Sequence, residues 1–264
     1  MKIYISSDLE GISGVVNFDQ NGRDSKGGEY ERARRLLTYE VNAVVEACKE
    51  AGVETVVAMD GHGSGFNFVV DELHPEGEYV LGGNRKKSFD GMTDDFDGII
   101  LLGYHGMAGT VNAIMDHTQS SKTWYNYWVN GIKMGEIGQH AILAGHKKIP
   151  VILVTGDTAT CKEAKELLPH VETVAVKEGY SRTCAKIIPP VTAREMIKKG
   201  VKKALKRIKS MKAYEVKFPV KARIEFQTTD VADGYERNGW NRINGTTVEK
   251  LVEKPQKGMD LKIY

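Results

Sequence analysis

The feature that most constrains the fold is a set of four short apolar runs, each ending in glycine and polar side chains. They are KIYIS before Asp8, VETVVAM before DGHG, GIILLG before YHG, and VILVTG before DT. Runs rich in Val and Ile, without polar alternation, are typical of parallel strands covered on both faces. Ligands of such sheets bind beyond the carboxyl ends of the strands. We therefore predict an α/β fold with a largely parallel central sheet and a functional site at that edge.

Three helices and one hairpin are expected around this sheet. Residues 30–52 carry apolar side chains at helical spacing, from Ala33 to Cys48, with Gly52 as a C-terminal stop. A second helix is expected over 135–145, and a third that starts at a Thr192–Glu195 box and continues to 212. The Asn130–Gly131 pair predicts a two-residue turn between strands.

A composition shift near residue 190 suggests two parts. Residues 1–190 are expected to form a metal-binding catalytic α/β domain. Residues 191–264 are expected to form a smaller α+β part, with a helix followed by strands and loops, related to assembly.

The composition is that of an ordinary globular protein and excludes few functions. The 264 residues suffice for one large domain, and 37 basic against 35 acidic residues give a net charge of +2, which favours neither nucleic acid nor a membrane as partner. No run approaches the ~20 apolar residues of a membrane helix. Three widely spaced cysteines, not in CxxC spacing, suit reduced thiols. We predict a cytoplasmic protein.

The stretch SSDLEGISG places two carboxylates, Asp8 and Glu10, one residue apart after the first strand. If strand alternation continues through residue 10, both side chains share a face. Such a pair of like charges is costly unless it is solvated, shares a proton or is neutralised by a cation.

Histidines at the same edge favour the cation. His62 in DGHGSG and His105 in GYHGMAG follow predicted strands and are flanked by small residues, although each sequence also fits a plain tight turn. Carboxylates with imidazoles form a ligand set that suits zinc. Two ions ~3.5–4 Å apart would activate water and polarise a carbonyl, so hydrolysis is the expected reaction.

For other residues, the neighbouring sequence allows both a functional and a structural role. His117 in MDHT fits an exposed loop histidine as well as a functional one, and Glu136 with His140 fits a surface helix pair as well as a metal pair. The run from Lys198 to Lys212 carries eight basic residues and no acid, which fits a nucleic-acid contact or, as we favour from its apolar spacing, the solvated face of an amphipathic helix. The chain has no GxSxG, GxGxxG or GxxxxGK[ST] motif.

Taken together, the motifs resemble those of the zinc-dependent bacterial D-aminopeptidases encoded with dipeptide-transport operons, a self-compartmentalising metallopeptidase group. The matching stretches are SSDLEGISG, DGHGSGFN, LGYHGMAG, MDHT, GEIGQHA and GDTATCKEAKELLP. They cover residues 1–190 well and the last quarter poorly.

The resemblance implies a dinuclear zinc site, with two Zn²⁺ per chain and a catalytic histidine at His117. The family's metal ligands fall on Asp8, Glu10, His62, His105 and Glu136. It also implies a large ring-like homo-oligomer, a decamer. The expected function is removal of N-terminal residues, of D configuration, from short peptides or amino-acid amides.

Two alternatives accompany this reading. One is a dinuclear metal amidase or esterase acting on another small substrate. The other is a non-enzymatic, metal-stabilised binding module whose basic helix contacts an acidic partner.

Overall fold

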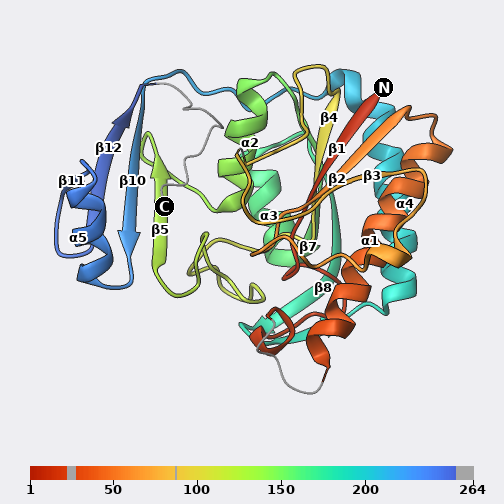
Figure 1. Ribbon diagram of the computed structural model, residues 1–264, viewed down its shortest axis with the longest axis horizontal. Coiled ribbons are helices and arrows are strands. Elements are labelled where there is room, and N and C mark those ends of the chain that lie inside the picture. The colour runs from red at the N-terminus through yellow and green to blue at the C-terminus, as the bar shows by residue number, and fades with distance from the viewer. Residues whose placement is uncertain (23–27, 87, 254–264) are drawn as a thin grey trace.

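A seven-stranded sheet forms the centre of the molecule in the computed structural model, which describes residues 1–22, 28–86 and 88–253 (Figure 1). The strand order is β3-β2-β1-β4-β7-β8-β9, and all neighbours are parallel except β8 and β9. The strands are β1 (Lys2–Ser7), β2 (Thr55–Asp60), β3 (Glu78–Val80), β4 (Gly98–Leu102), β7 (Val151–Asp157), β8 (Glu172–Ser181) and β9 (Cys184–Ile187). The predicted parallel sheet is confirmed, and all four apolar runs are strands in it.

Helices cover both faces of this sheet. They are α1 (Glu29–Glu50), α2 (Glu136–His146), α3 (Thr158–Leu167) and α4 (Pro190–Arg207). Because strand side chains alternate, Ile3 and Ile5 lie in the core cluster that includes residues of α1 and α4, whereas Tyr4 lies in the cluster that includes α2 and α3. The result is a three-layer arrangement with helices on either side (Figure 1).

Two of the three helices begin and end as expected, and one does not. In α1, Gly52 has a φ of 79° and its N–H donates to Lys49 O, so the predicted stop is confirmed. Helix α4 begins at Pro190 with no side-chain cap, so the Thr192–Glu195 capping box was wrong; proline is favoured at the first helical position. The helix also ends before residue 212, because a 3₁₀ turn at Ile208–Ser210 follows and Met211 is extended.

A second, antiparallel sheet draws on distant parts of the chain. Its order is β11-β12-β10-β5-β6, and β10 pairs with β5. The elements of this region are β5 (Trp124–Val129), β6 (Ile132–Lys133), β10 (Val220–Phe226), α5 (Thr229–Arg237), β11 (Asn241–Arg242) and β12 (Thr247–Val252). The predicted hairpin is confirmed, since Asn130 and Gly131 both have positive φ and join β5 to β6.

Helix α2 lies between the two sheets. Ile137 and Ala141 belong to a core cluster of the parallel sheet, while Ile142 belongs to the cluster of the antiparallel sheet. Near its end, a Cβ on Gly145 would lie 2.0 Å from the carbonyl oxygen of Tyr214, so only glycine allows this close approach. The helix is therefore buried on both sides.

The two sheets do not divide the chain at residue 190. Helix α4 beyond that point packs against α1, and β5–β6 before it belong to the second sheet. Residues 254–264 of the expected C-terminal part lie outside the described residues.

The basic side of α4 contacts acidic side chains. Lys198 pairs with Glu46 at 2.8 Å, Lys202 with Glu50 at 2.7 Å, and Arg207 lies 3.7 Å from Glu172. Much of the charge that could have marked a nucleic-acid contact is thus compensated within the fold. Among the described residues, no helix combines the length and the apolar character needed to cross a membrane.

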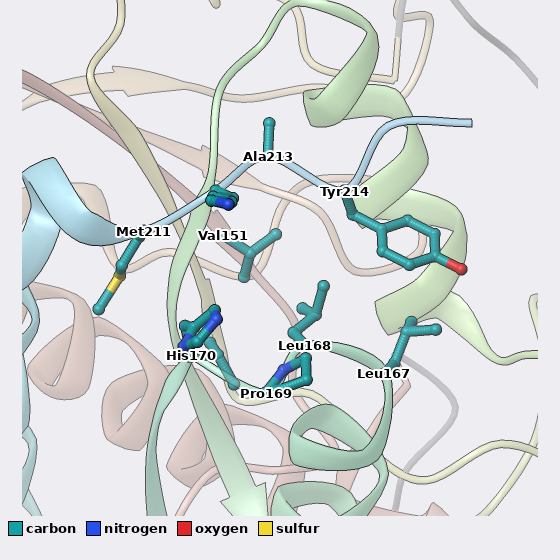
Figure 2. A pocket seen from close by; sticks show the side chains of 10 residues that line it. Val151, Leu167, Leu168, Pro169, His170, Met211, Ala213 and Tyr214 are labelled. Carbon is teal, nitrogen blue, oxygen red and sulfur yellow. The ribbon is translucent and has the colours of Figure 1, made fainter. Parts of the chain in front are cut away.

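A small hollow of about 130 Å³ lies at the amino-terminal ends of β7 and β8 (Figure 2). Val151 and Leu168 form part of its wall, and Met211 and Tyr214 reach it from the segment that follows α4 (Figure 2). It lies at the opposite end of the strands from the polar side chains that the sequence singled out.

Candidate metal centre

Three neighbouring strands bring the predicted residues together at one edge. In the parallel register Ser7 lies beside Asp60 and Leu102, so the segments that follow β1, β2 and β4 leave the sheet side by side. These segments carry Asp8 with Glu10, His62, and His105. Glu136 reaches the same place from the first turn of α2, and His117 from the loop before β5.

The segment after β1 is a turn rather than a longer strand. Strand β1 ends at Ser7, the N–H of Ile12 donates to Leu9 O, and the N–H of Gly11 donates to Gly103 O. Strand alternation, the condition under which Asp8 and Glu10 would share a strand face, therefore does not continue through residue 10. Asp8 and Glu10 share a site because this turn folds back, and it packs so closely that a Cβ on Gly11 would lie 2.0 Å from Tyr104 O.

Asp8 occupies the middle of the cluster. Its Oδ1 lies 3.0 Å from Nδ1 of His62, and its Oδ2 lies 3.5 Å from Nε2 of His105. Glu10 completes the His62 side, with Oε2 at 3.1 Å from the same Nδ1. Glu136 completes the His105 side, with Oε1 at 3.3 Å from Nε2. The side chains thus form two adjoining groups that share one carboxylate.

The electrostatics of the cluster depend on this mixture of signs. Burial and the adjacent Glu10 raise the pKa of Asp8 to about 7. Burial opposes protonation of His105, yet the adjacent carboxylate of Glu136, 3.3 Å from Nε2, raises the pKa of that imidazole to about 10. Likewise, the pKa of His62 is raised well above its usual range because Glu10 and Asp8 outweigh burial. The carboxylates therefore require positive charge beside them, which a metal ion also supplies.

Two buried atoms without a hydrogen-bond partner show that the cluster fits a cation. Among the described residues, Oε2 of Glu10 and Nε2 of His105 are both buried and unsatisfied. Unsatisfied buried polar atoms are rare in folded proteins and call for an explanation. Both atoms point into the cluster, and carboxylate oxygen with imidazole nitrogen is a donor set of zinc.

His117 lies beside this cluster, held by its other nitrogen. Its Nδ1 is 2.8 Å from Met115 O, its Nε2 is 3.8 Å from Oε1 of Glu136, and its ring stacks on His105 with centroids 3.9 Å apart. Burial and the charge of His105 lower the pKa of His117. The structure thus places a neutral imidazole against the cluster, close enough to act on a substrate or to join His105 and Glu136 as a ligand.

His140, by contrast, lies apart from the cluster. Its Nδ1 is 2.6 Å from the hydroxyl of Tyr104, which is 2.8 Å from Ser6 Oγ. Although Glu136 and His140 share one helix, only Glu136 reaches the carboxylate and histidine groups.

Several residues hold the site in roles that sequence reasoning did not assign. Asp60 accepts hydrogen bonds from the N–H groups of Asn67 and Phe68 and so fixes the loop after His62. Glu163 accepts from the N–H of Met107 at 2.8 Å, two residues beyond His105. Asp157 accepts from the N–H of Ile114 at 2.7 Å, in the loop that leads to His117.

The buried ammonium of Lys177 does the same for the turn after β1. It donates to the carbonyl oxygens of Glu10, Ile12 and Val15, the last two at 3.0 and 2.5 Å. A lysine within a strand suggests a solvent-exposed face, so only the tertiary structure reveals this role.

Comparisons with known proteins identify the family of the chain. A family model for D-aminopeptidases, peptidase family M55, matches residues 1–261. A D-aminopeptidase of Bacillus subtilis (strain 168) is 36% identical over 198 residues, which is 75% of this chain and 71% of that protein.

A solved structure is similar over nearly the whole length. The Zn-dependent D-aminopeptidase DppA from Bacillus subtilis, described as a self-compartmentalizing protease, matches with a TM-score of 0.92 at 31% sequence identity, covering 98% of this chain and 94% of that chain. The resemblance inferred from the motifs, and the aminopeptidase activity expected from it, are thereby confirmed. The chain belongs to the D-aminopeptidase family, peptidase family M55.

Proposed function

We propose that this aminopeptidase uses two zinc ions per chain to remove N-terminal residues of D configuration from short peptides or amino-acid amides. The observation that carries the dinuclear site is the position of Asp8, whose two oxygens face two different histidines. A carboxylate shared in this way suits a bridging ligand between two cations. The zinc dependence of the similar DppA structure supports the choice of metal.

The residues divide into two ligand groups in this proposal. Glu10 and His62 would hold one ion and His105 and Glu136 the other, with Asp8 between them. Bound zinc supplies Lewis acidity that polarises a carbonyl and makes water more acidic. The hydrogen bonds of Asp60, Glu163 and Lys177 to the surrounding loops would keep the ligands in place during the reaction.

His117 would transfer the proton that amide cleavage requires. Its lowered pKa leaves the imidazole neutral near pH 7, so it can accept a proton from water and return it to the departing amine. Its Nε2, which lies 3.8 Å from Oε1 of Glu136, is the atom for this exchange, because Nδ1 faces Met115 O.

The first test is the metal content of Asp8→Asn. An amide bridges two cations poorly, so we expect the variant to lose at least one of two zinc ions and more than ~100-fold in activity, beyond the usual effect of changing a residue that only supports a ligand. Asp116→Asn, an exchange of the same chemistry outside the cluster, serves as the control for metal content. Full zinc occupancy with a near-normal rate in Asp8→Asn would contradict the dinuclear site.

The substrate is tested with a panel of paired compounds. D- and L-aminoacyl amides, D- and L-dipeptides and simple acyl esters are offered to the zinc-loaded enzyme. We expect cleavage of D-aminoacyl compounds, with little turnover of the L series. Preferential cleavage of esters or of N-blocked amides would instead identify a metal amidase or esterase.

A further inference from the structure

A cavity of about 480 Å³ adjoins His117. Its volume lies within the ~300–1,000 Å³ typical of small-molecule sites. Charged and aromatic side chains on its wall are Asp116, Lys122, Trp124, Tyr125 and Arg182. Since Nε2 of His117 is 3.8 Å from Glu136, one imidazole borders both the cluster and this cavity.

The carboxylate of Asp116 is already compensated. Its Oδ1 accepts from Nε of Arg182 at 2.9 Å, and its Oδ2 accepts from the N–H of Gly109 at 2.7 Å. A further bond at 3.0 Å joins Nη2 of Arg182 to the carbonyl oxygen of Asp116. Arg182 is also held from another side, where its guanidinium lies 4.9 Å from the ring centroid of Phe18. Asp116 thus orients Arg182 and offers little charge to a ligand.

Once Asp116 is paired with Arg182, the net charge on the cavity wall is positive. Lys122 lines the cavity, and within residues 1–22, 28–86 and 88–253 its ammonium has no hydrogen-bond or ion-pair partner. Together with Arg182 it gives two cations against one paired carboxylate. An anionic group is therefore attracted to this wall, while the ammonium group at the N-terminus of a peptide is repelled.

We propose that this cavity binds the residue that follows the scissile bond, and that Lys122 and Arg182 hold its C-terminal carboxylate. This inference rests on the proposed function. The charge of the cavity wall sets the orientation of the bound peptide. The N-terminal ammonium of the substrate is kept out of the cavity, so the leaving residue passes His117 and enters it. Dipeptides with a free carboxylate are then the preferred substrate class, ahead of the same peptides with an amidated end.

The test compares two substrates that differ only at this end, D-alanylglycine and D-alanylglycinamide. We expect wild-type kcat/KM to be about tenfold or more higher for the free acid, as a charge-assisted hydrogen bond would give. In Lys122→Met the preference should shrink to about twofold through a rise in KM for the acid, and Lys122→Arg should restore much of it. Lys162→Met, an exposed lysine of α3, is the matched control and should keep the wild-type preference.

A binding measurement separates the cavity from the chemistry. N-acetylglycine and N-acetylglycinamide cannot act as aminopeptidase substrates, so their affinities can be compared calorimetrically in any variant. Tighter binding of the acid that is lost in Lys122→Met supports the proposal even if neither peptide is hydrolysed, a result that would count against the proposed function alone. Equal binding of acid and amide by the wild type, or an unchanged acid preference in Lys122→Met, overturns the inference.

Discussion

At the scale of single residues, two histidines with stacked rings have different surroundings. His105 is fully enclosed, with Nε2 between Asp8 and Glu136, whereas His117 also borders the cavity. The pKa of the first is raised and that of the second is lowered. Adjacent imidazoles in opposite protonation states suit different tasks, and their variants should differ accordingly.

We expect His117→Ala to retain both metal ions while losing most of kcat, about 10²- to 10⁴-fold, because proton transfer by a positioned group contributes this much. His105→Ala should lose metal as well as activity. Metal analysis and steady-state kinetics on the same preparations make the comparison. Loss of metal from His117→Ala equal to that from His105→Ala would identify His117 as a ligand instead.

Glu40 gives the fold a pH dependence away from the ligands. Its Oε1 accepts from the N–H of Ser13 at 2.8 Å, its Oε2 has no hydrogen-bond partner among the described residues, and burial raises its pKa to about 7. In the unfolded chain this carboxyl loses its proton near pH 4.5. As pH rises from about 4.5 to 7, the unfolded state is therefore favoured progressively.

Replacement by glutamine should remove this effect, because an amide keeps the acceptor for Ser13 and does not ionise. Relative to Glu40→Gln, we expect the free energy of unfolding of the wild type to fall by up to about 3 kcal/mol between pH 4.5 and 7. Urea unfolding of both proteins at several pH values measures the difference. A difference independent of pH would show that Glu40 ionises normally in the fold.

At the scale of elements, the loops at the carboxyl edge are fixed by buried charged groups that lie elsewhere in the sheet and helices. The turn after β1 is the clearest case, since the ammonium of Lys177 on β8 supplies donors to three of its carbonyl groups. Lys177 is only 2% exposed, and burial lowers its pKa to about 8. Burial of a charged lysine is costly, so we infer that its hydrogen bonds serve to hold the turn after β1 in one conformation.

Removal of that donor should loosen the turn that carries Glu10. We expect Lys177→Met to lower the free energy of unfolding by about 3–5 kcal/mol, because three carbonyls lose their partner in a buried site. Zinc affinity should fall in parallel, at least tenfold. Lys186→Met on neighbouring β9, where the lysine is 65% exposed, should leave the free energy of unfolding almost unchanged. A Lys177→Met protein as stable as the wild type would contradict the role of this lysine.

The elements also show what sequence can predict. Strands β1, β2, β4 and β7 and their common edge follow from local apolar runs and a general rule of parallel sheets, and Asn130–Gly131 signals its own turn. Pairing of β5 with β10 joins segments about 90 residues apart and leaves no local pattern. Glu136 was placed in the site only through family resemblance, since a helix position four residues before a histidine has several explanations. The ligand assignments themselves stay predictions until metal is measured.

At the scale of the whole molecule, the expected homo-oligomer is the prediction that a measurement on the protein has to test. The similar DppA structure is described as self-compartmentalizing, and the chain matches it over 98% of its length. That description supports the expectation of a homo-oligomer for this chain.

We expect light scattering coupled to size exclusion to give a mass near 290 kDa, ten times the 29.3 kDa of one chain. The measurement should be made with and without zinc. A particle of 29 kDa at micromolar concentration would rule out the decamer for this chain and leave the active site open to larger peptides.

The position of α2 between the two sheets has a consequence for the order of folding. One side of this helix is covered by the parallel sheet, but the other is covered by a sheet that contains β10 and β12. During synthesis that covering cannot form until residues 220–252 leave the ribosome, and domains acquire such long-range pairings late. Because Glu136 begins this helix, we expect its position to become fixed only after those strands have formed.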